Sequence, residues 1–530
     1  MLWIVENLGK NKLVEIHIWN TRCKLVGLTD QKIIKVLDHE LSYQLAGYDF
    51  AASSGRIYSG WDGRVRLMDK KLQFPVGLMR RAGKLLVESG EEVFVVDHRN
   101  LPRGELIDIV KSSGFTPRDY QVDAVDLAEK HGSGIIRMCT GSGKTSVIAM
   151  VAGRFNVKTM IYVIGIELLY QMKSTVETLL GVKCGIIGDG VCDIQEDGIN
   201  ICTIWTAAQA FGEKIELIDC DLTSANKFKP SILQKAKIQR AVKGAQLFVL
   251  DECQYAASKS LQFLHRISEE ARYRFLLSGT PWREMGDDLL IEAVSGPKFY
   301  DLPASRLIDS GVLVAPKIYF INVPKMKNLH GAYADVYSSY IVKNITRNNL
   351  IVDAATNLVS SGKKVLILVS RIEHGQILFE MTKDNFNVSI LDGSSTTESR
   401  LGAISDMRSG KLELLIASKI FDQGIDIPEL DALILAGSGK SSGRALQRIG
   451  RVIRSSPGKK YANVIEFWDN AKYLESHSTA RLKIYKSEPG FKIKIGSRTM
   501  VDEEAAPPPA RVKKNDRRRV LPEDSGVDWS

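Results

Sequence analysis

Two series of short, almost continuous apolar runs dominate the middle of the chain. The first series occupies residues 134–139, 159–165, 199–205, 246–252 and 273–279, and the second occupies residues 364–370, 387–393, 412–418, 431–437 and 461–469. These runs are rich in β-branched residues and are separated by stretches with helical character. Strands that are buried on both faces of a parallel sheet have this composition. The pattern therefore predicts two α/β domains in tandem, divided near the Ser-Gly-Pro sequence at residues 295–297.

The first hundred residues follow a different pattern. Val14, Ile16 and Ile18 alternate with polar or aromatic positions, which places the three aliphatic side chains on one face of a predicted strand. Residues 97–104, with the sequence DHRNLPRG, are typical of a linker. A small α+β domain is therefore expected in front of the two α/β domains.

The predicted organisation has four segments. They are an α+β N-terminal domain in residues 1–100, a first α/β domain in residues 104–298, a second α/β domain in residues 299–480, and a basic tail in residues 481–530. The tail lacks apolar periodicity in its last thirty or so positions, so we expect it to be disordered. Its RVKKNDRRRV run fits either an arm that contacts phosphates or a solvated terminus.

Composition narrows the class of protein. The chain has 530 residues, 44% hydrophobic and 25% charged, and it contains no apolar run near the roughly 20 residues needed to span a bilayer. The seven cysteines are scattered without C-x-x-C spacing, which favours reduced thiols in the cytoplasm over disulfides or a zinc site. The net charge of +10 permits a polyanionic partner but does not by itself indicate one.

A glycine-rich loop follows the first apolar run of the first α/β domain. Its sequence is CTGSGKT, and it contains Thr140, Gly141, Ser142, Gly143, Lys144 and Thr145. Bare backbone between a buried strand and a helix can direct N–H groups at an anion, and the helix N-terminus adds partial positive charge. Lys144 can then reach the outer phosphates of ATP, and the Thr145 hydroxyl can bind Mg²⁺. The loop predicts a nucleotide site, although Met138 replaces the usual first glycine.

Two adjacent carboxylates follow another buried run of the same domain. Asp251 and Glu252 come directly after residues 246–250, at the carboxyl end of a predicted parallel strand, where ligands of open α/β sheets bind. Asp251 can hold the Mg²⁺ shell, and Glu252 can orient and deprotonate the attacking water. A solvated pair of acids is the alternative for these two residues taken alone.

Arginines recur on a predicted helix of the second domain. Gln447, Arg448, Arg451 and Arg454 are spaced by one to four residues, so several lie near one face. A guanidinium aimed at the γ-phosphate stabilises the charge that develops there during transfer. If Arg451 and Arg454 serve a nucleotide held by the first domain, the two domains must close on each other.

These segments, in this order, resemble the motifs of superfamily 2 helicases and translocases over roughly residues 105–475. The DECQ sequence at residues 251–254 resembles the DExH box, SGT at residues 278–280 resembles motif III, and FDQGIDIP at residues 421–428 resembles motif V. The QRIGRVIR sequence at residues 447–454 is similar to motif VI with its arginine fingers. The resemblance implies two tandem RecA-like domains and an ATPase that is stimulated by nucleic acid.

The resemblance also implies roles for individual residues. Adenine recognition is assigned to Arg118, Tyr120 and Gln121, further nucleotide contacts to Gly424 and Asp426, coupling of hydrolysis to the strand to Gln254, Ser278, Gly279 and Thr280, and catalysis to Lys144, Glu252, Gln447, Arg451 and Arg454. Gln254 departs from the box, where histidine is common. That departure affects how hydrolysis is coupled to the strand, and does not affect hydrolysis itself.

The N-terminal sequence extends the likeness. YSGWDGRVRLMD at residues 58–69 is similar to the front of phage UvsW-type helicases, which migrate branches and regress forks. Asp62-Gly63 predicts a hairpin turn, and the strand after it places Arg64 and Arg66 on one face. These two arginines and Trp61 are therefore candidates to hold duplex or junction DNA, while a purely structural hairpin is the alternative.

The expected protein is an ATP- and Mg²⁺-dependent DNA helicase or translocase that acts on branched, forked or single-stranded DNA, with RNA–DNA hybrids as a further substrate. An RNA helicase and the translocating subunit of a restriction system remain open alternatives, because they share the same chemistry. A nucleic-acid-binding scaffold without ATPase activity would show damage at a catalytic position, and all of these positions are intact. The sequence does not identify protein partners.

Overall fold

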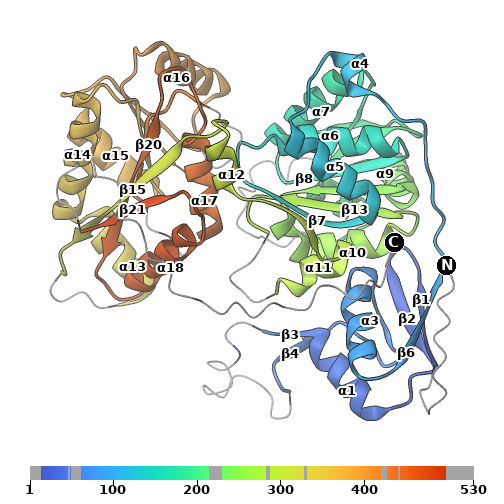
Figure 1. Cartoon of the computed structure of the whole chain (residues 1–530). Coiled ribbons are helices and arrows are strands. Elements are labelled where there is room, and N and C mark those ends of the chain that lie inside the picture. The colour runs from blue at the N-terminus through green and yellow to red at the C-terminus, as the bar shows by residue number, and fades with distance from the viewer. Residues whose placement is uncertain are drawn as a thin grey trace, which may run out of the picture.

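The computed structural model describes residues 13–45, 48, 61–213, 230–281, 287–326, 331–418, 427–437, 439 and 442–496. Two larger α/β units lie side by side, and a smaller N-terminal unit lies next to the first of them (Figure 1). Gly424 and Asp426 of the motif V segment and the tail from residue 497 onward lie outside the described residues. Within the described ranges, no helix has both the length and the apolar character needed to cross a bilayer.

The N-terminal unit is a small α+β layer structure. Its strands are β1 (Leu13–Ile18), β2 (Arg22–Val26), β3 (Ser42–Gln44), β4 (Arg64–Arg66), β5 (Gln73–Pro75) and β6 (Glu92–Asp97), and its helices are α1 (Gln31–Glu40), η1 (Val76–Leu78) and α3 (Met79–Glu88). The main sheet has the order β5-β2-β1-β6. Val14, Ile16 and Ile18 are buried against α1 and α3, which confirms the predicted inward face of β1.

The predicted hairpin differs in the structure. Gly63 adopts a left-handed turn conformation with φ 75°, as the sequence indicates. The strand that follows, β4, pairs with the distant β3. The residues that would form the preceding arm of a tight hairpin, 49–60, lie outside the described residues. The turn is therefore present, and the described partner of β4 lies about twenty residues upstream of it.

The first large unit is built on an eight-stranded sheet. Its strands are β7 (Ser133–Met138), β8 (Thr159–Val163), β9 (Gly185–Gly188), β10 (Val191–Asp193), β11 (Ile199–Thr203), β12 (Leu247–Asp251), β13 (Tyr273–Ser278) and β14 (Lys298–Leu302), in the order β10-β9-β11-β8-β12-β13-β7-β14. All neighbouring pairs except β9 and β10 are parallel. The first predicted series of buried strands is therefore confirmed.

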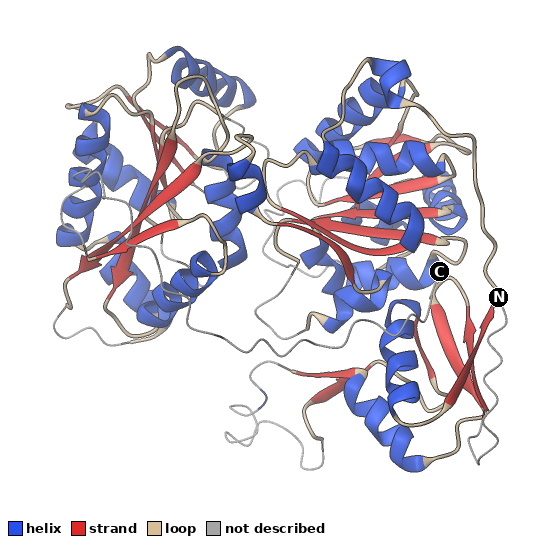
Figure 2. Ribbon diagram, viewed as in Figure 1, coloured by secondary structure: helices blue, strands red, loops and turns tan. Residues whose placement is uncertain are grey.

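Helices cover both faces of this sheet (Figure 2). They are α4 (Ile109–Ser113), α5 (Asp119–His131), α6 (Lys144–Phe155), α7 (Ile166–Leu180), α8 (Ile204–Ala210), α9 (Ile232–Gly244), η2 (Cys253–Ala257), α10 (Lys259–Ile267) and α11 (Leu289–Ser295). Alternate strand residues face α5, α6 and α7 on one side, and α8 to α11 on the other. This double burial explains why most positions of the central strands are apolar.

The second large unit has a seven-stranded, wholly parallel sheet. Its strands are β15 (Ala315–Val323), β16 (Val365–Leu368), β17 (Val388–Leu391), β18 (Leu414–Ala417), β19 (Ala432–Leu435), β20 (Tyr461–Asp469) and β21 (Lys492–Ile495), in the order β17-β18-β16-β19-β20-β15-β21. Its helices are α13 (Tyr333–Tyr337), the π-helical η3 (Ser338–Val342), α14 (Ile345–Ser360), α15 (Ile372–Thr382), α16 (Thr397–Ser409), α17 (Ser442–Val452) and α18 (Leu474–Lys486). The second predicted series is confirmed as well.

Two predicted boundaries differ from the strand pairing. The division at residues 298/299 falls within β14, which pairs with β7 in the first sheet. The predicted start of the tail at residue 481 falls within α18, and β21 beyond it pairs with β15. Regular structure in the second unit therefore extends to residue 495.

The two units share one continuous core. A short helix, α12 (Ala304–Asp309), connects β14 to β15. Side chains of α12 and of the segment after it, Leu307 and Leu313, belong to the same buried cluster as α6 of the first unit and α17 of the second. The ends of α12 and α17 therefore lie where the two sheets meet (Figure 1).

Candidate nucleotide site between the two sheets

The glycine-rich loop joins β7 to α6. Gly141 and Gly143 have φ values of 88° and 82°, and Gly143 directly precedes the first residue of α6. Glycine adopts this left-handed conformation without the steric penalty of a Cβ atom, so the loop can curl around an anion at the N-terminus of α6. Lys144 begins the helix, and its Nζ reaches back to the Met138 carbonyl at 3.5 Å. The backbone has the form that the sequence predicts for a phosphate-binding loop.

The predicted adenine-recognition residues lie beside this loop. Gln121 is 2% exposed, and its Nε2 donates to the carbonyl of Ser142 at 3.2 Å. Its Oε1 accepts a hydrogen bond from the Arg118 backbone N–H at 3.0 Å, which caps the start of α5. Arg118 in turn donates to the Tyr120 hydroxyl at 2.9 Å. Gln121 thus links the first turn of α5 to the loop, while Arg118 and Tyr120 form a pair next to it.

The two acids stand at the end of β12, as predicted. Asp251 is the last residue of the strand and is 7% exposed. Burial, and to a smaller degree the neighbouring Glu252 carboxylate, raises the pKa of Asp251, whereas the Lys144 ammonium opposes the rise. A buried acid whose pKa is shifted by specific charges in a cleft is typical of a functional site. The effect of Lys144 also shows that the loop and the acid are electrostatic neighbours.

Glu252 has an unusual backbone. Its φ is 64°, a left-handed conformation that is strained for a residue with a Cβ atom. Strain of this kind amounts to about 1–3 kcal/mol and is concentrated at functional sites. The left-handed conformation of Glu252 turns the chain from the end of β12 into η2.

A hydrogen-bond network converges on the Glu252 carboxylate. Its Oε2 accepts from Gln254 Nε2 at 3.0 Å and from Gln447 Nε2 of α17 at 2.9 Å. The Ser278 hydroxyl lies 3.2 Å from the same oxygen and 2.8 Å from Gln254 Oε1, and it accepts from the Thr280 N–H at 3.0 Å. The structure therefore brings together the segments that resemble the DExH box, motif III and motif VI.

Helix α17 also contacts the glycine-rich loop. A Cβ atom at Gly450 would lie 2.3 Å from the Thr140 Cβ, so glycine is required where the helix meets the loop. At Gly141, a Cβ atom would lie 3.7 Å from Arg454 Cγ, which places the Arg454 side chain over the loop. The backbone of Arg454 forms a bridge with Leu313, next to α12. Arg451 is one helical turn from Gln447 on the same helix.

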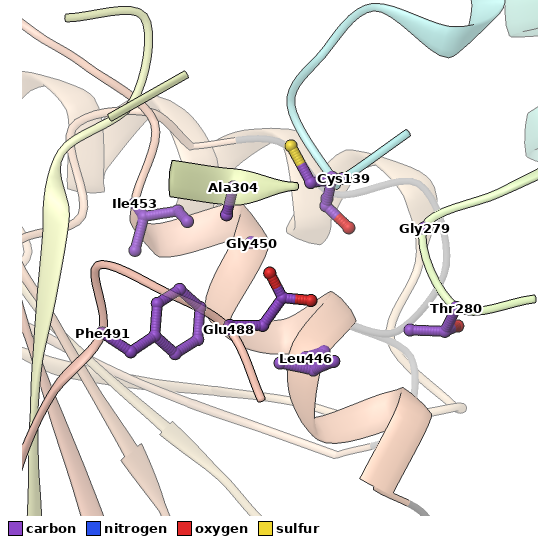
Figure 3. Close-up of a pocket in the computed structure, with 10 residues that line it drawn as sticks. Cys139, Gly279, Thr280, Ala304, Leu446, Gly450, Ile453, Glu488 and Phe491 are labelled. Carbon is purple, nitrogen blue, oxygen red and sulfur yellow. The ribbon is translucent and has the colours of Figure 1, made fainter. Parts of the chain in front are cut away.

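A small cavity of about 20 Å³ lies at this junction. Its walls come from the start of the glycine-rich loop, from the motif III segment, from α12, from α17 and from the segment after α18. Figure 3 shows the Glu488 carboxylate among Cys139, Leu446, Gly450 and Phe491. Room for about one water molecule remains there.

The predicted N-terminal residues lie apart from the nucleotide site. Arg64 donates to the Ser42 hydroxyl at 2.8 Å and to the His39 carbonyl at 2.9 Å. Arg66 pairs with Asp38 at 2.7 Å and with Asp62 at 2.6 Å. Both guanidinium groups are therefore held within their own unit, and a phosphate would have to replace or share these partners. Contact of Arg64, Arg66 and the half-exposed Trp61 with DNA stays a prediction.

Three residues of the junction were missed by the sequence reading. Gly450 lies inside a helical pattern, where an isolated glycine is a visible signal of close approach. Arg137 and Glu488 form an ion pair between β7 and the segment after α18. The two residues are 351 positions apart, so no local pattern could relate them.

Two family models match the chain. The helicase conserved C-terminal domain matches residues 347–456, and the res subunit of type III restriction enzymes matches residues 114–283. Among curated relatives, the ATP-dependent DNA helicase uvsW of Enterobacteria phage T4 is 24% identical over 497 residues, covering 85% of this chain and 93% of the relative. The DNA 3'-5' translocase XPB2 of Sulfurisphaera tokodaii is 25% identical over 376 residues, covering 64% of this chain and 78% of the relative.

A solved structure supports the fold. The ATP-dependent type ISP restriction-modification enzyme LlaBIII bound to DNA shares 14% identity, with a TM-score of 0.51, over 76% of this chain and 33% of that one. The two family matches fall in the two parallel-sheet units, and the relatives are helicases and translocases. The chain is a superfamily 2 ATP-dependent helicase that resembles UvsW, and nucleic acid is its substrate.

Proposed function

We propose that this superfamily 2 helicase uses ATP hydrolysis to unwind or migrate branched and forked DNA. The observation that carries the proposal is the hydrogen bond between Gln447 of the second unit and Glu252 of the first, made while α17 covers the glycine-rich loop. A nucleotide in the loop would lie within reach of side chains from both units. Binding and release of ATP can then open and close the cleft, and hydrolysis becomes relative motion of the units.

The first unit would hold the triphosphate. Amides of Gly141 to Lys144 surround the phosphates, and Lys144 neutralises the outer ones. Arg118, Tyr120 and Gln121 would contact the adenine end, with Gln121 also fixing the loop through Ser142. The predicted residues Gly424 and Asp426 would add contacts from the second unit.

The residues near the loop also fit a magnesium ion. Asp251 supplies a buried carboxylate and Thr145 a hydroxyl, and Mg²⁺ is usually held by one or two such oxygens together with phosphate oxygens and water. A bound Mg²⁺ would neutralise charge on the phosphates. Apart from these ligands, the described residues contain no cluster of three or more His, Cys, Asp or Glu side chains that could hold a metal.

Hydrolysis would be completed across the cleft. Glu252, fixed by Gln254 and Gln447, would orient and deprotonate the attacking water. Arg451 and Arg454 would stabilise the charge that develops on the γ-phosphate oxygens. A change at Glu252 would be transmitted to the surface that binds the nucleic-acid strand through Ser278, Gly279 and Thr280. The contact that starts this path is the Ser278 hydroxyl, which lies 3.2 Å from the Glu252 carboxylate.

DNA is the favoured polymer because the N-terminal sequence resembles UvsW-type helicases, and because the phage T4 relative that aligns with 85% of this chain is a DNA helicase. The enzyme would contact the phosphates of the nucleic acid. It would therefore select its substrate by the structure of the nucleic acid and not by its base sequence. Free thiols at the six described cysteines fit the reducing cytoplasm, where such an enzyme would act.

The test measures phosphate release with single-stranded DNA, forked DNA, RNA or no polymer. We expect stimulation by DNA, strongest with forks. Response to RNA alone would establish the RNA-helicase alternative, and absence of any turnover would establish a scaffold. Unwinding of a Holliday-type junction, a fork and an RNA–DNA hybrid under one ATP condition then ranks the substrates.

The N-terminal contacts have their own test. Replacing Arg64 and Arg66 together by alanine should weaken binding to forked DNA and lower its dependence on salt concentration. The matched control is the double change of Lys70 and Lys71 to alanine, because these exposed lysines lie in the following turn of the same unit. Equal affinity and equal salt dependence in the Arg64/Arg66 variant would remove these residues from the DNA site.

A second function is favoured by one observation. The first unit matches the res subunit of type III restriction enzymes over residues 114–283. Translocation along duplex DNA without strand separation would support this alternative. A triplex-displacement assay next to the unwinding assay distinguishes the two.

A further inference from the structure

Arg137 occupies a central position just before the glycine-rich loop. It is the fifth residue of β7, and its side chain is 11% exposed. One guanidinium nitrogen donates to the Gly279 carbonyl of the motif III segment at 3.4 Å, and another donates to Asp301 of β14 at 2.8 Å. The third pairs with Glu488. One side chain therefore joins the nucleotide loop, motif III and the second unit.

Glu488 reaches Arg137 from the far side of the junction. It follows α18, and its side chain is 4% exposed. Neighbouring residues hold it in place: a Cβ atom at Gly490 would lie 3.5 Å from Ile308 of α12, and Phe491 packs on the shared core. One carboxylate oxygen meets Arg137. The other, Oε2, is buried without a hydrogen-bond partner among the described residues and lies at the small cavity.

The charge of Glu488 reaches the nucleotide loop. Burial raises the pKa of the Cys139 thiol to about 12, and the Glu488 carboxylate adds to this rise while Lys144 opposes it. A bare carboxylate at this place would repel a triphosphate. The Arg137 guanidinium offsets that charge, but only while the two units are together.

If the two units separated, Arg137 and Glu488 would be affected differently. Arg137 would keep Asp301, since both belong to the first sheet. Glu488 would lose its only described ionic partner, and a buried charge left without a partner is strongly unfavourable unless water reaches it. The pair therefore favours the closed arrangement.

We propose that Arg137 and Glu488 form an interlobe latch, and that Glu488 is a positioning residue that sets the affinity for ATP by stabilising closure of the cleft. This inference rests on the proposed function, because it assumes that the nucleotide binds between the units. Glu488 lies outside the segments that resemble helicase motifs. Its action is indirect, through Arg137, on the strand that carries the nucleotide loop.

The test uses the full chain with Glu488→Gln, which keeps the shape and removes the charge. We expect the KM for ATP to rise about tenfold while kcat changes less than about twofold. The variant loses a charge-assisted interaction that stabilises the closed cleft, and it loses no interaction that is made in the chemical step. The first control is Asp301→Asn, which removes the carboxylate that pairs with Arg137 within the first unit. The second is Glu475→Gln on the exposed face of α18. Neither control should raise the KM.

Closure itself gives an independent readout. Energy transfer between dyes on exposed positions of the two units should increase with a non-hydrolysable ATP analogue, and Glu488→Gln should need about tenfold more analogue for the same increase. Both measurements are made first without nucleic acid. If DNA fails to stimulate the unaltered enzyme, the proposed substrate is wrong, while the latch is still read from the analogue titration.

Two results would overturn the latch. One is a KM for Glu488→Gln equal to that of Asp301→Asn. The other is a lower melting temperature with unchanged KM, which would make the pair merely structural. Should Glu488→Gln fail to fold, Glu488→Ala replaces it, because alanine itself brings no polar group into the junction and Arg137 keeps Asp301. The same rise in KM at constant kcat is expected.

Discussion

The two large sheets share one architecture and use charge in opposite ways. In the first, chemistry-bearing residues follow the ends of β7, β12 and β13, and these strands are neighbours in the sheet. The glycine-rich loop, Asp251 and Ser278 therefore meet at one edge. In the second, several buried charges are paired inside the unit, as between Arg347 and Asp469 at 2.8 Å.

The difference reflects what each sheet has to accommodate. The first leaves a buried acid, Asp251, with a raised pKa beside a lysine, and a bound cation would favour the ionised carboxylate there. The second neutralises most of these charges within the unit: Arg481 pairs with Glu466 at 3.1 Å, and this fixes α18 on β20. The described part of its helix α17 then presents Gln447 and Gly450 to the first unit. Under the proposed function, one sheet would hold the nucleotide, and the other positions a helix against it.

Lys144→Ala gives the most severe test of the first sheet. We expect ATP turnover to disappear, because the alanine cannot neutralise the outer phosphates, while much of the DNA binding is kept. Phosphate release and DNA binding by fluorescence anisotropy are measured on the same preparation. Full ATPase activity in this variant would mean that the glycine-rich loop is not the nucleotide site.

Arg451→Ala tests whether the second sheet contributes to the chemistry. The loss of a guanidinium at the γ-phosphate should lower kcat about 10³-fold. Lys483→Ala, an exposed cation of α18, serves as the control for loss of positive charge. If both variants hydrolyse ATP at the normal rate, Arg451 does not take part in hydrolysis. The second sheet would then contribute no arginine to the chemistry.

Asp469→Asn tests the opposite claim, that the buried charges of the second sheet are structural. Arg347 would be left buried with one weakened partner, so we expect the free energy of unfolding to fall by about 3 kcal/mol. Urea unfolding measures this change, with the exposed Asp406→Asn as control. Turnover per folded molecule should stay within about twofold of normal. A large loss of kcat without loss of stability would contradict the structural role.

Gln254→Ala tests the network that joins the sheets. Without the Gln254 amide, Glu252 keeps its hydrogen bond from Gln447 but loses the one from Gln254 Nε2 at 3.0 Å. We expect kcat to fall about tenfold, because the Glu252 carboxylate would no longer be held in the orientation that activates water. Gln254→His, which restores an N–H donor of the kind common in the DExH box, should recover most of the rate. Equal rates for alanine and histidine would show that the amide does not orient Glu252.

The smallest expected effect is on the pH dependence of stability. His374 is fully buried beside Asn348, and burial, followed by the Arg347 charge, lowers its pKa from 6.5 to about 3. Unfolding lets this histidine take up a proton, so its contribution to stability is complete above pH 6.5 and is lost as the pH falls toward 3. Between pH 6.5 and 5.5 the loss should be about 1 kcal/mol.

The pH effect is checked by urea unfolding at a series of pH values. His374→Gln keeps a polar side chain without a titratable group, and the variant should show a flatter pH profile over this range. The same slope in the variant and the unaltered protein would assign the effect to other groups.

Much of the site could be predicted because its residues are local to strand ends. A buried run followed by Asp251 and Glu252, or by Gly141 to Thr145, specifies both the element and the edge on which the side chains lie. The apolar composition of both series likewise predicts double burial, which the structure confirms. Neither inference needs knowledge of distant residues.

What was missed depends on contacts between distant segments. The short sequence KIKI of β21 lies in a charged region and becomes a strand only because β15 offers it an edge. The alternation of Arg64 and Arg66 is correct, but their partners Ser42 and Asp38 come from the preceding helix and strand. The Arg137–Glu488 pair depends on how the two units close, which no local pattern contains.

The short connection through α12 has a consequence for kinetics. Arg454 is tied to that connection through Leu313, so the proposed arginine finger and the glycine-rich loop belong to one tethered molecule. A tether of this length gives the finger a high effective concentration near its target. The rate of hydrolysis per molecule should therefore stay constant on dilution, because no encounter with another subunit is needed to deliver the arginine.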